Sequence, residues 1–442
     1  MAKSTASYLC SSCGAKSNQW SGKCFECGDW GSLEADQAAT LNVSAGSGKQ
    51  VSGKKIQASP ISKKTKGIDS HRLSTGTKEV DQVLGGGVVQ GSVVLLAGQP
   101  GAGKSTLLLQ VAAYLGKSSK TIYISGEESE RQVSSRANRL KLGATDLQLA
   151  SNNSADDIAA TIASGDYDAV IVDSIQTINT SSSSGVQGGV SQIVNSTHML
   201  INAAKQSDTA LILVGHVTKE GNIAGPKLLE HLVDVVLQLE GDKFVGFKLL
   251  RGRKNRYGSV DEVAVMEMGE LGMHPVDNPS AALLEERQLT DGSVIFAAME
   301  GTKPLLVEIQ ALTNKSAFGY PKRTAVGFSQ NRLNLIIAIL EKRTKLSLSD
   351  IDIYISVSGG LTITEPAADL AVAMAIASSA KGLALPKDAA VYGEVGLGGE
   401  IRRVIFADKR AKEAKKVGFK TVIGPASTKK LDLKSLLNTY LK

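Results

Sequence analysis

Short apolar runs alternate with segments of helical periodicity across the middle of this chain. Between residue 67 and about residue 275 each apolar run is bounded by polar, turn-forming residues. The runs are Val93–Ala97, Thr121–Ser125, Ala169–Val172, Ala210–Val214 and Val233–Leu239. This alternation predicts an α/β domain over residues 67–278, with a mostly parallel sheet flanked by helices.

The last third of the chain repeats the mixture of strand and helix patterns. Three strands are predicted at Val294–Ala297, Leu305–Ile309 and Ile351–Val357. Two helices are predicted at Leu333–Leu340 and Leu370–Ser379. We therefore expect a second α/β domain over residues 279–442.

The first 66 residues carry a different signal. Residues 37–66 are rich in Ser, Gly, Ala and Lys, without periodicity, which predicts a flexible basic linker. All four cysteines lie before it, as two Cys-x-x-Cys pairs: Cys10, Cys13, Cys24 and Cys27. This spacing favours one structural Zn²⁺ in a module over residues 1–36, and disulfides are the rival interpretation.

Three aromatic side chains accompany the cysteines. They are Trp20, Phe25 and Trp30, and the chain has no other tryptophan. Packing into a small core is the expected role, and a surface for nucleic acid or a partner domain is the alternative.

Length and charge limit the function classes. The 442 residues imply two or three compact units. No apolar run approaches the roughly 20 residues of a membrane span, so we expect a cytoplasmic protein without a membrane partner. The net charge of +7 gathers in residues 41–66, 248–257 and 402–416, which favours a polyanionic partner over three solvated lysine faces.

A phosphate-binding loop joins the first apolar strand to the next helix. Its glycines allow backbone N–H groups to face phosphate, Lys104 would reach the β- and γ-phosphates, and Ser105 would supply a hydroxyl to Mg²⁺. The loop precedes the predicted helix Leu107–Leu115 and predicts ATP binding. Its residues are Gly98, Gln99, Pro100, Gly101, Ala102, Gly103, Lys104, Ser105 and Thr106.

Acidic residues follow two of the other predicted strands. Asp173 ends the strand Ala169–Val172 and would hold Mg²⁺ through water. Glu127 follows Thr121–Ser125 and is the candidate base for an attacking water. Glu128 is a possible substitute for it, and an acidic helix start is the alternative interpretation.

The stretch that leads into the phosphate loop resembles the entry to a RecA-type ATPase core. It contains Ser74–Gly76, Val80-Asp81, Leu84–Gly87 and Gly91. The resemblance implies that His216, at the end of a later strand, senses the γ-phosphate, although a core histidine would fit the sequence too. It also implies that the polar segment 179–189, which looks too flexible to pack, is a DNA-facing loop, with Ser182, Ser183 and Gly188 as candidate contacts.

The pentapeptide Lys254-Asn255-Arg256-Tyr257-Gly258 closely resembles a signature of the RadA (Sms) family of bacterial DNA repair proteins. The likeness covers nearly the whole chain. It implies that Lys254 and Arg256 reach ATP bound by a neighbouring subunit of a hexameric ring. Contact with DNA phosphates is the alternative role for these two cations.

The C-terminal segments Gly359–Leu361, Glu365–Asp369 and Gly393–Gly399 resemble the proteolytic domain of Lon. The position of the serine nucleophile holds Ala367, and the position of the lysine partner holds Asp408. An ATP-driven protease is therefore not expected, because no hydroxyl is available to attack a peptide. Assembly and DNA contact remain as roles, with four candidate cations: Arg402, Arg403, Lys409 and Arg410.

These observations predict a DNA-dependent ATPase of recombinational repair that requires ATP, Mg²⁺ and one Zn²⁺. The resemblance implies a ring-shaped motor that promotes branch migration on single-stranded and branched DNA together with the RecA recombinase. A nucleotide-switched DNA-binding scaffold that does not translocate is the alternative.

Overall fold

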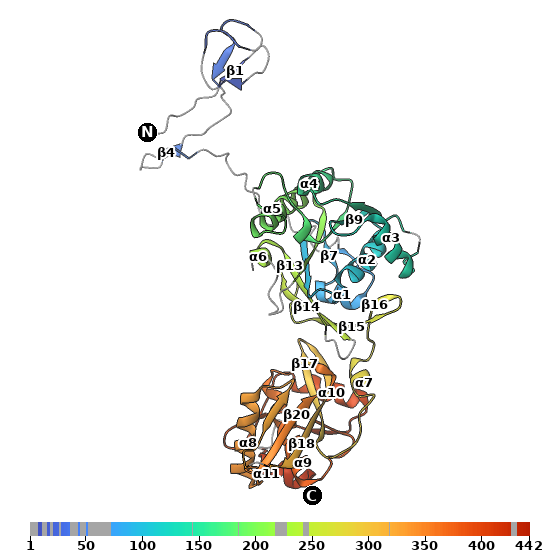
Figure 1. The fold of residues 1–442 in the computed structure, drawn as a ribbon, viewed down its shortest axis with the longest axis vertical. Coiled ribbons are helices and arrows are strands. Elements are labelled where there is room, and N and C mark those ends of the chain that lie inside the picture. Colours follow the sequence, from blue (N-terminus) through green and yellow to red (C-terminus); the bar gives the residue numbers. More distant parts are fainter. Residues whose placement is uncertain are drawn as a thin grey trace. The chain divides into compact units, whose positions relative to one another are not determined.

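The computed structural model divides the chain into two compact units, Met1–Asp69 and Ser70–Lys442 (Figure 1). It describes residues 8–10, 16–17, 21–25, 28–35, 43–44, 50–51 and 72–442, apart from residues 144, 184, 217–227, 242–246, 318 and 426–430.

Short antiparallel strands form the described part of the first unit. The central strand of a three-stranded sheet ends at Cys10, and its neighbours pair with it on both sides. Most of the predicted linker lies outside the described residues. The strands are β2 (Lys16–Ser17), β1 (Tyr8–Cys10) and β3 (Leu33–Ala35), and a separate pair β4 (Val43–Ser44) and β5 (Gln50–Val51).

A nine-stranded sheet forms the centre of residues 72–275. It is parallel over its first six strands and antiparallel over its last three. The strands in spatial order are β10 (Gln148–Ser151), β9 (Thr121–Ser125), β11 (Ala169–Asp173), β12 (Ala210–His216), β8 (Val93–Gly98), β13 (Val235–Gly241), β14 (Phe247–Asn255), β15 (Val263–Gly269) and β16 (Gly272–Pro275). The predicted mostly parallel sheet is confirmed.

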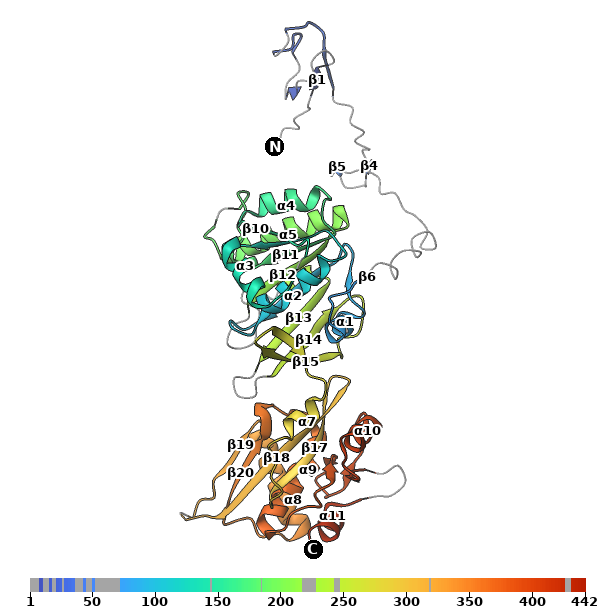
Figure 2. The same cartoon turned by 90° about the vertical axis from the view of Figure 1, so that its right-hand side faces the viewer.

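Helices cover both faces of this sheet, so β8 is buried at every position. One core packs Leu107 and Val111 against Leu96, and α4 and α5 lie side by side over the other core (Figure 2). The helices are α1 (Lys78–Leu84), α2 (Lys104–Leu115), α3 (Glu130–Arg139), α4 (Ala155–Ala163), α5 (Val190–Ser207) and α6 (Leu228–Leu232). A short strand pair, β6 (Arg72–Leu73) and β7 (Val88–Val89), flanks α1.

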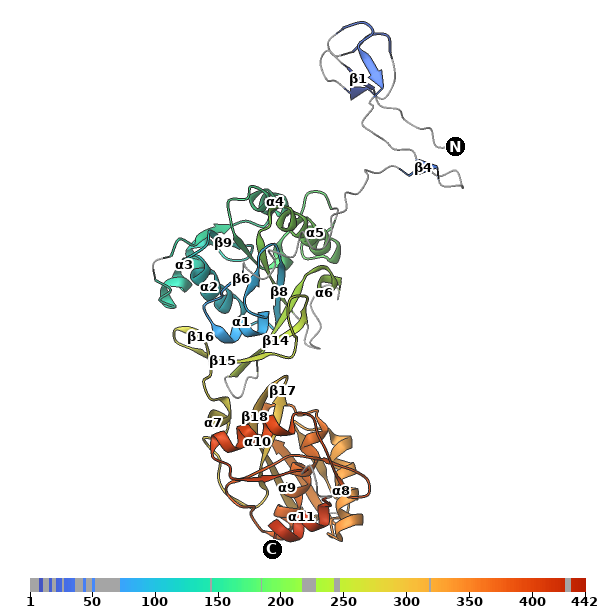
Figure 3. The same ribbon diagram turned by 180° about the vertical axis from the view of Figure 1, so that it is seen from behind.

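The C-terminal part has its own sheet and its own apolar core. Helix α9 is buried from Asp369 to Ser378 and packs against β17 and β18 (Figure 3). The sheet order is β19 (Arg323–Val326), β20 (Ile351–Val357), β18 (Lys303–Lys315), β17 (Ser293–Glu300), β21 (Ala389–Val391) and β24 (Thr421–Ile423). The remaining elements are α7 (Pro279–Leu283), α8 (Gln330–Thr344), α9 (Asp369–Lys381), α10 (Ala407–Val417), α11 (Leu433–Tyr440) and the pair β22 (Glu394–Val395) and β23 (Ile401–Arg402).

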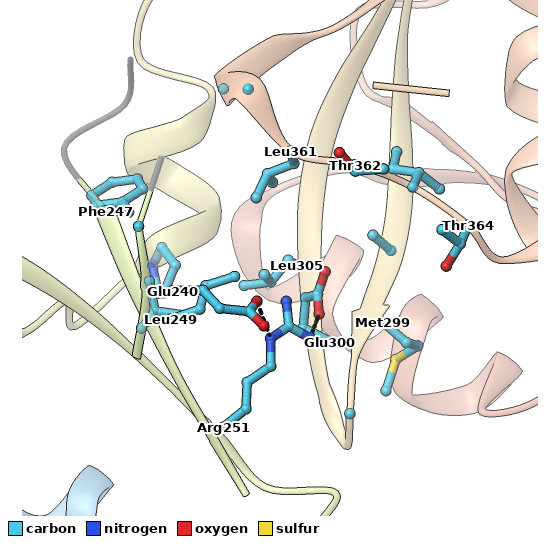
Figure 4. A pocket seen from close by; sticks show the side chains of 18 of the residues that line it. Glu240, Phe247, Leu249, Arg251, Met299, Glu300, Leu305, Leu361, Thr362 and Thr364 are labelled. Atoms are coloured by element: carbon cyan, nitrogen blue, oxygen red, sulfur yellow. Dashed lines mark hydrogen bonds and ion pairs between the residues drawn. The ribbon is translucent and has the colours of Figure 1, made fainter. Parts of the chain in front are cut away.

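The turn between β17 and β18 docks on the part of the chain that carries the nine-stranded sheet. Arg251 of β14 pairs with Glu300 at 2.5 Å, and the Thr302 N–H donates to the Asp261 carbonyl at 2.8 Å. Gly301 has φ +59°, and a Cβ there would lie 1.8 Å from the Asp261 oxygen, so only glycine fits. A cavity of about 840 Å³ lies beside the Arg251–Glu300 pair (Figure 4).

Candidate active site

The phosphate loop connects the centre of the sheet to α2. Gly103 precedes the helix with φ +101°, and its Cα faces the methionines of the β15–β16 pair. A Cβ at Gly103 would lie 2.5 Å from the terminal carbon of Met273 and 2.6 Å from that of Met268. Those methionine tips can shift, so it is the positive φ that favours glycine here, and a loop of this kind at a helix N-terminus presents backbone N–H groups to phosphate.

Lys104 begins α2 and is 5% exposed. Its Nζ donates to the carbonyls of Gly98 (3.0 Å) and Gln99 (3.1 Å), and lies 3.2 Å from Nδ1 of His216. Burial lowers the pKa of Lys104, while Asp173 and Glu127 act in the opposite direction. The cation is thus held at the loop by carbonyl oxygens, close to where phosphate would sit.

His216 ends β12 between two of the predicted site residues. Its Nδ1 faces Lys104, and its Nε2 lies 3.7 Å from Oε1 of Glu127. Burial, followed by the nearby Lys104, lowers the pKa of His216, which favours the neutral ring. The structure places this histidine at the site rather than in the core, as the γ-phosphate interpretation requires.

The two predicted carboxylates are held by neighbouring hydroxyl groups. Asp173 ends β11, is 8% exposed, and accepts a hydrogen bond from the hydroxyl of Tyr123. Glu127 accepts one from Ser174 at 2.5 Å. Burial, followed by Asp173, raises the pKa of Tyr123, so its hydroxyl keeps its proton. The sequence analysis did not find Tyr123 or Ser174. Tyr123 is a residue with a polar group inside an apolar strand, and Ser174 directly follows the end of β11.

Glu128 faces away from this group. Its carboxylate pairs with Arg136 of α3, while its backbone N–H donates to the Ser125 hydroxyl at 2.8 Å. Of the two adjacent glutamates, Glu127 is the one that contacts His216 and Ser174. This geometry favours Glu127 as the base.

Hard oxygen donors for Mg²⁺ lie on two elements. Ser105 stands in the first turn of α2, and Asp173 stands at the carboxyl end of β11, two strands from β8. A hydroxyl and a carboxylate at this edge are the donor types that Mg²⁺ takes beside nucleotide phosphates. The residues present therefore fit Mg²⁺. Thr106 follows Ser105 in the first turn of α2.

Lys254 and Arg256 lie at the other end of the sheet. Asn255 pairs with Val235, which pairs with Val94 near the start of β8, whereas the phosphate loop follows the end of β8. A chain therefore cannot bring these cations to its own phosphate loop without unpairing β14.

Both cations are held by nearby acceptors. Lys254 donates to the carbonyls of Glu230 (2.8 Å), His231 (3.2 Å) and Val233 (2.7 Å). Arg256 pairs with Asp234 at 2.8 Å and remains half-exposed. Asp234 is 2% exposed and also accepts from the Val93 N–H. The sequence analysis missed this anchoring carboxylate.

The polar segment 179–189 is partly packed, contrary to the expectation that it is too flexible to pack. Gln192 of α5 is buried, and its amide bonds the Thr180 N–H at 2.9 Å and the Ser183 carbonyl at 2.6 Å. The Ser182 hydroxyl contacts Thr180 at 2.9 Å. Gly188 has φ +78° and is exposed. One buried glutamine thus replaces the missing apolar contacts.

Three of the four C-terminal cations reach the surface. Arg402, Arg403 and Lys409 are exposed, and Arg402 pairs with Glu400 at 2.7 Å. Lys409 lies over the ring of Phe406, 5.0 Å from its centroid. These three stay candidates for DNA contact.

Arg410 is fully buried, so the prediction that it contacts DNA is wrong. Its guanidinium pairs with Glu365 and donates to the Ala297 carbonyl at 2.5 Å. It also stacks on Phe296, 5.9 Å from the ring centroid. A basic run on a helix looks solvated in sequence, but this position faces the core.

The former protease positions have no nucleophile among them. Ala367 is 2% exposed in a short 3-10 turn (Pro366–Ala368), and Asp408 is exposed at the start of α10. Two partly buried ion pairs flank Ala367, one formed by Glu365 with Arg410 and the other by Asp369 with Arg332. A methyl group cannot attack a peptide, whatever surrounds it.

The described part of the cysteine module fits a metal knuckle. Cys24 is 3% exposed, and its carbonyl accepts from the Gly28 N–H at 3.0 Å in a tight turn. Cys10 ends β1, whereas Cys13 and Cys27 lie outside the described residues. Phe25 and Trp30 are 85% and 76% exposed, so packing into a small core is wrong for both of them. Trp20 lies outside the described residues.

Removing zinc is expected to unfold this module alone, because it is too small to be stable without metal. Adding a zinc-selective chelator should change tryptophan fluorescence, since Trp20 and Trp30 both lie in the module. ATP turnover measured with excess Mg²⁺ should persist. Zinc, but not Mg²⁺, should restore the fluorescence; a purified protein without about one zinc per chain would contradict the assignment.

Three protein-family models match the chain, one for each predicted folded part. An AAA domain matches residues 59–222, a rubredoxin metal binding domain matches residues 8–35, and subunit ChlI of Mg-chelatase matches residues 309–428. Fold and site together define a RecA-like ATPase-type domain joined to an N-terminal zinc ribbon and a C-terminal Lon-like domain. The predicted fold class is confirmed.

Proteins named DNA repair protein RadA are similar to this chain along almost all of its length. The relative from Bacillus subtilis is 45% identical over 430 residues, covering 97% of this chain and 94% of that protein. The relative from Brucella abortus is 43% identical over 428 residues, covering 95% and 91%. The chain belongs to the RadA family of DNA repair proteins.

Solved structures match a smaller share of the chain. The RadB recombinase has a TM-score of 0.36 and 23% identity, covering 46% of this chain and 100% of that structure. A KaiC-like protein from Pyrococcus horikoshii has a TM-score of 0.39 and 18% identity, covering 47% and 99%. Within the described residues, no helix is both long and apolar enough to cross a membrane.

Proposed function

We propose that the protein is a DNA-dependent ATPase of recombinational repair. The observation that supports this most is the convergence of Lys104, His216, Glu127 and Asp173 at the carboxyl ends of neighbouring parallel strands. This edge is where α/β sheets of this kind bind phosphate-containing ligands. Membership in a family of DNA repair proteins supports DNA as the partner. We place the protein in the cytoplasm, in agreement with ATP hydrolysis and DNA binding.

The site residues take separate roles in hydrolysis. The loop Gly98–Thr106 holds the triphosphate, and Lys104 neutralises charge on its β- and γ-phosphates. Mg²⁺ held by Ser105 and Asp173 would supply further charge neutralisation. Glu127 takes a proton from the attacking water, and His216 lies where it can sense the γ-phosphate.

The trans-acting cations belong to a neighbouring subunit. The pairing of β14 with β13, and of β13 with β8, places Lys254 and Arg256 near the first residues of β8. The phosphate loop of the same chain follows the last residues of β8, at the opposite end of the sheet. Head-to-tail contacts between identical chains form a ring when the rotation between subunits closes, and such a contact would bring Arg256 to the next phosphate loop. We assign the protein to a hexameric ring that moves on single-stranded and branched DNA and promotes branch migration with RecA recombinase.

Mixing two inactive variants tests the shared site. Lys104→Ala and Arg256→Ala should each lose DNA-stimulated ATP turnover. The first variant lacks the lysine of its own phosphate loop, and the second lacks the arginine that it would supply to the site of the neighbouring subunit. An equal mixture should regain about a quarter of the wild-type activity, because that share of interfaces then pairs an intact Lys104 with an intact Arg256. The measurement is steady-state ATP hydrolysis with and without single-stranded DNA.

A matched control is Arg253→Ala, which removes an exposed arginine near the end of β14, the strand that Arg256 follows; this arginine pairs with Glu240 at 2.7 Å. It should keep its turnover. If Arg256→Ala keeps full DNA-stimulated turnover, the trans role is wrong and the pentapeptide is a DNA contact. Turnover without strand displacement on branched DNA would instead favour the non-translocating scaffold.

A further inference from the structure

A tyrosine inside the sheet directs its hydroxyl at the carboxylate assigned to Mg²⁺. Tyr123 lies in the middle of β9 and is 1% exposed. It stands opposite Ile171 of the parallel strand β11, two residues before Asp173. The phenol ring therefore reaches along the strand to the edge of the sheet, where its hydroxyl donates to Oδ2 of Asp173.

This hydrogen bond restrains the Asp173 carboxylate. Asp173 is 8% exposed and stands at the end of its strand. With Oδ2 accepting from Tyr123, rotation of the carboxylate is restricted, so its remaining lone pairs would face Mg²⁺ or a bound water from a fixed direction. Hydrogen bonds to charged acceptors are stronger than those between neutral groups.

We propose that Tyr123 is a positioning residue for magnesium, which acts by orienting the Asp173 carboxylate. The inference rests on the proposed ATPase function and on the assignment of Asp173 to Mg²⁺. Partners that orient metal-holding carboxylates typically change metal affinity by about 10–100-fold when they are removed. Tyr123 contacts neither the nucleotide nor the metal in this role.

The variant Tyr123→Phe isolates the hydroxyl, because the ring keeps its place in the apolar core. Tyr392→Phe is the matched control. Tyr392 is also buried, at 5% exposed, and its hydroxyl donates to the Ala407 carbonyl at 3.2 Å in the C-terminal domain. Both variants lose one buried hydroxyl with one hydrogen bond, and since the bond to the Asp173 carboxylate is the stronger one, the ADP protection of each variant is compared with its own stability without ligand.

The test is the Mg²⁺ dependence of ATP turnover. Tyr123→Phe should raise the Mg²⁺ concentration for half-maximal turnover about ten-fold, while turnover at saturating Mg²⁺ changes far less. Thermal protection by ADP should likewise require more Mg²⁺, and protection by ADP in the presence of EDTA should stay unchanged. An Mg²⁺ midpoint equal to that of Tyr392→Phe in both assays would overturn the proposal.

A double-mutant cycle with Asp173→Asn separates action through Asp173 from a wider effect of the substitution. If Tyr123 acts through this carboxylate, adding Tyr123→Phe to Asp173→Asn should not shift the Mg²⁺ dependence of ADP protection further. An additive shift would overturn the proposal. If wild type fails to hydrolyse ATP, the proposed function fails instead, while ADP protection still decides the role of Tyr123.

Discussion

Replacing Glu127 by glutamine is expected to lower ATP turnover by about 10²–10⁴-fold, the usual contribution of a general base. Glutamine has nearly the same shape and still accepts the hydrogen bond from Ser174, which is 2.5 Å long in the native protein. It cannot take a proton from the attacking water. The phosphate loop is unchanged, so binding of a fluorescent ATP analogue should be retained while single-turnover hydrolysis is lost.

Glu128→Gln is the matched control for this experiment. Its carboxylate pairs with Arg136 on α3, and side chains of that pair are one-fifth to one-third exposed. Such a partly exposed pair contributes little, so turnover should stay within a few-fold of wild type. The reverse result, with Glu128→Gln inactive and Glu127→Gln active, would move the base to Glu128.

His216 lies between the residue assigned to phosphate binding and the residue assigned to water activation. The ring lies between Lys104 and Glu127, and its lowered pKa keeps it neutral at physiological pH. With Nδ1 accepting from Lys104, the remaining ring proton sits on Nε2 and faces Glu127. A phosphate that draws Lys104 forward would change both contacts at once, which gives the site a physical means of sensing its ligand.

The sequence predicted best what is encoded by contiguous residues. The loop Gly98–Thr106 carries its strand, its glycines and its helix in one stretch, so both fold and ligand could be inferred. Asp173 and Glu127 required only the additional rule that parallel strands end at one edge. Most predicted strand limits were correct to within a few residues because buried strands are continuous apolar runs, but β18 continues to Lys315, well beyond its predicted end at Ile309.

What the sequence could not predict depends on partners far apart along the chain. Tyr123 donates a hydrogen bond to Asp173, which lies fifty positions later in the chain. Arg256 contacts Asp234 because β13 and β14 pair with each other. Neither contact has a local signature. The antiparallel strands β15 and β16 were missed as well. The sequence analysis did not single out the apolar run 263–266 that begins β15, and the short strand β16 depends on its pairing with β15 and its contact with α2.

Replacing Arg410 by methionine is expected to destabilise the C-terminal domain by about 3–5 kcal/mol, the cost of leaving a buried charge without its partner. Arg410 is fully buried and pairs with Glu365, whose Oε1 also accepts from the Met299 N–H at 2.8 Å. Removing the guanidinium leaves that carboxylate uncompensated. Hydrogen exchange of the amides in β17 and α10 of the full chain measures this loss.

Lys409→Met is the matched control, because it changes the adjacent position of the same helix at the surface. It should leave hydrogen exchange unchanged and weaken DNA binding at low salt only modestly, as the loss of one phosphate contact would. Adding Glu365→Leu to Arg410→Met should recover most of the stability, since a buried pair replaced by apolar groups is often neutral. The opposite result would be an Arg410→Met variant that keeps its exchange protection and loses DNA affinity. That result would contradict the structural role and would mean that Arg410 leaves the core when the protein binds DNA.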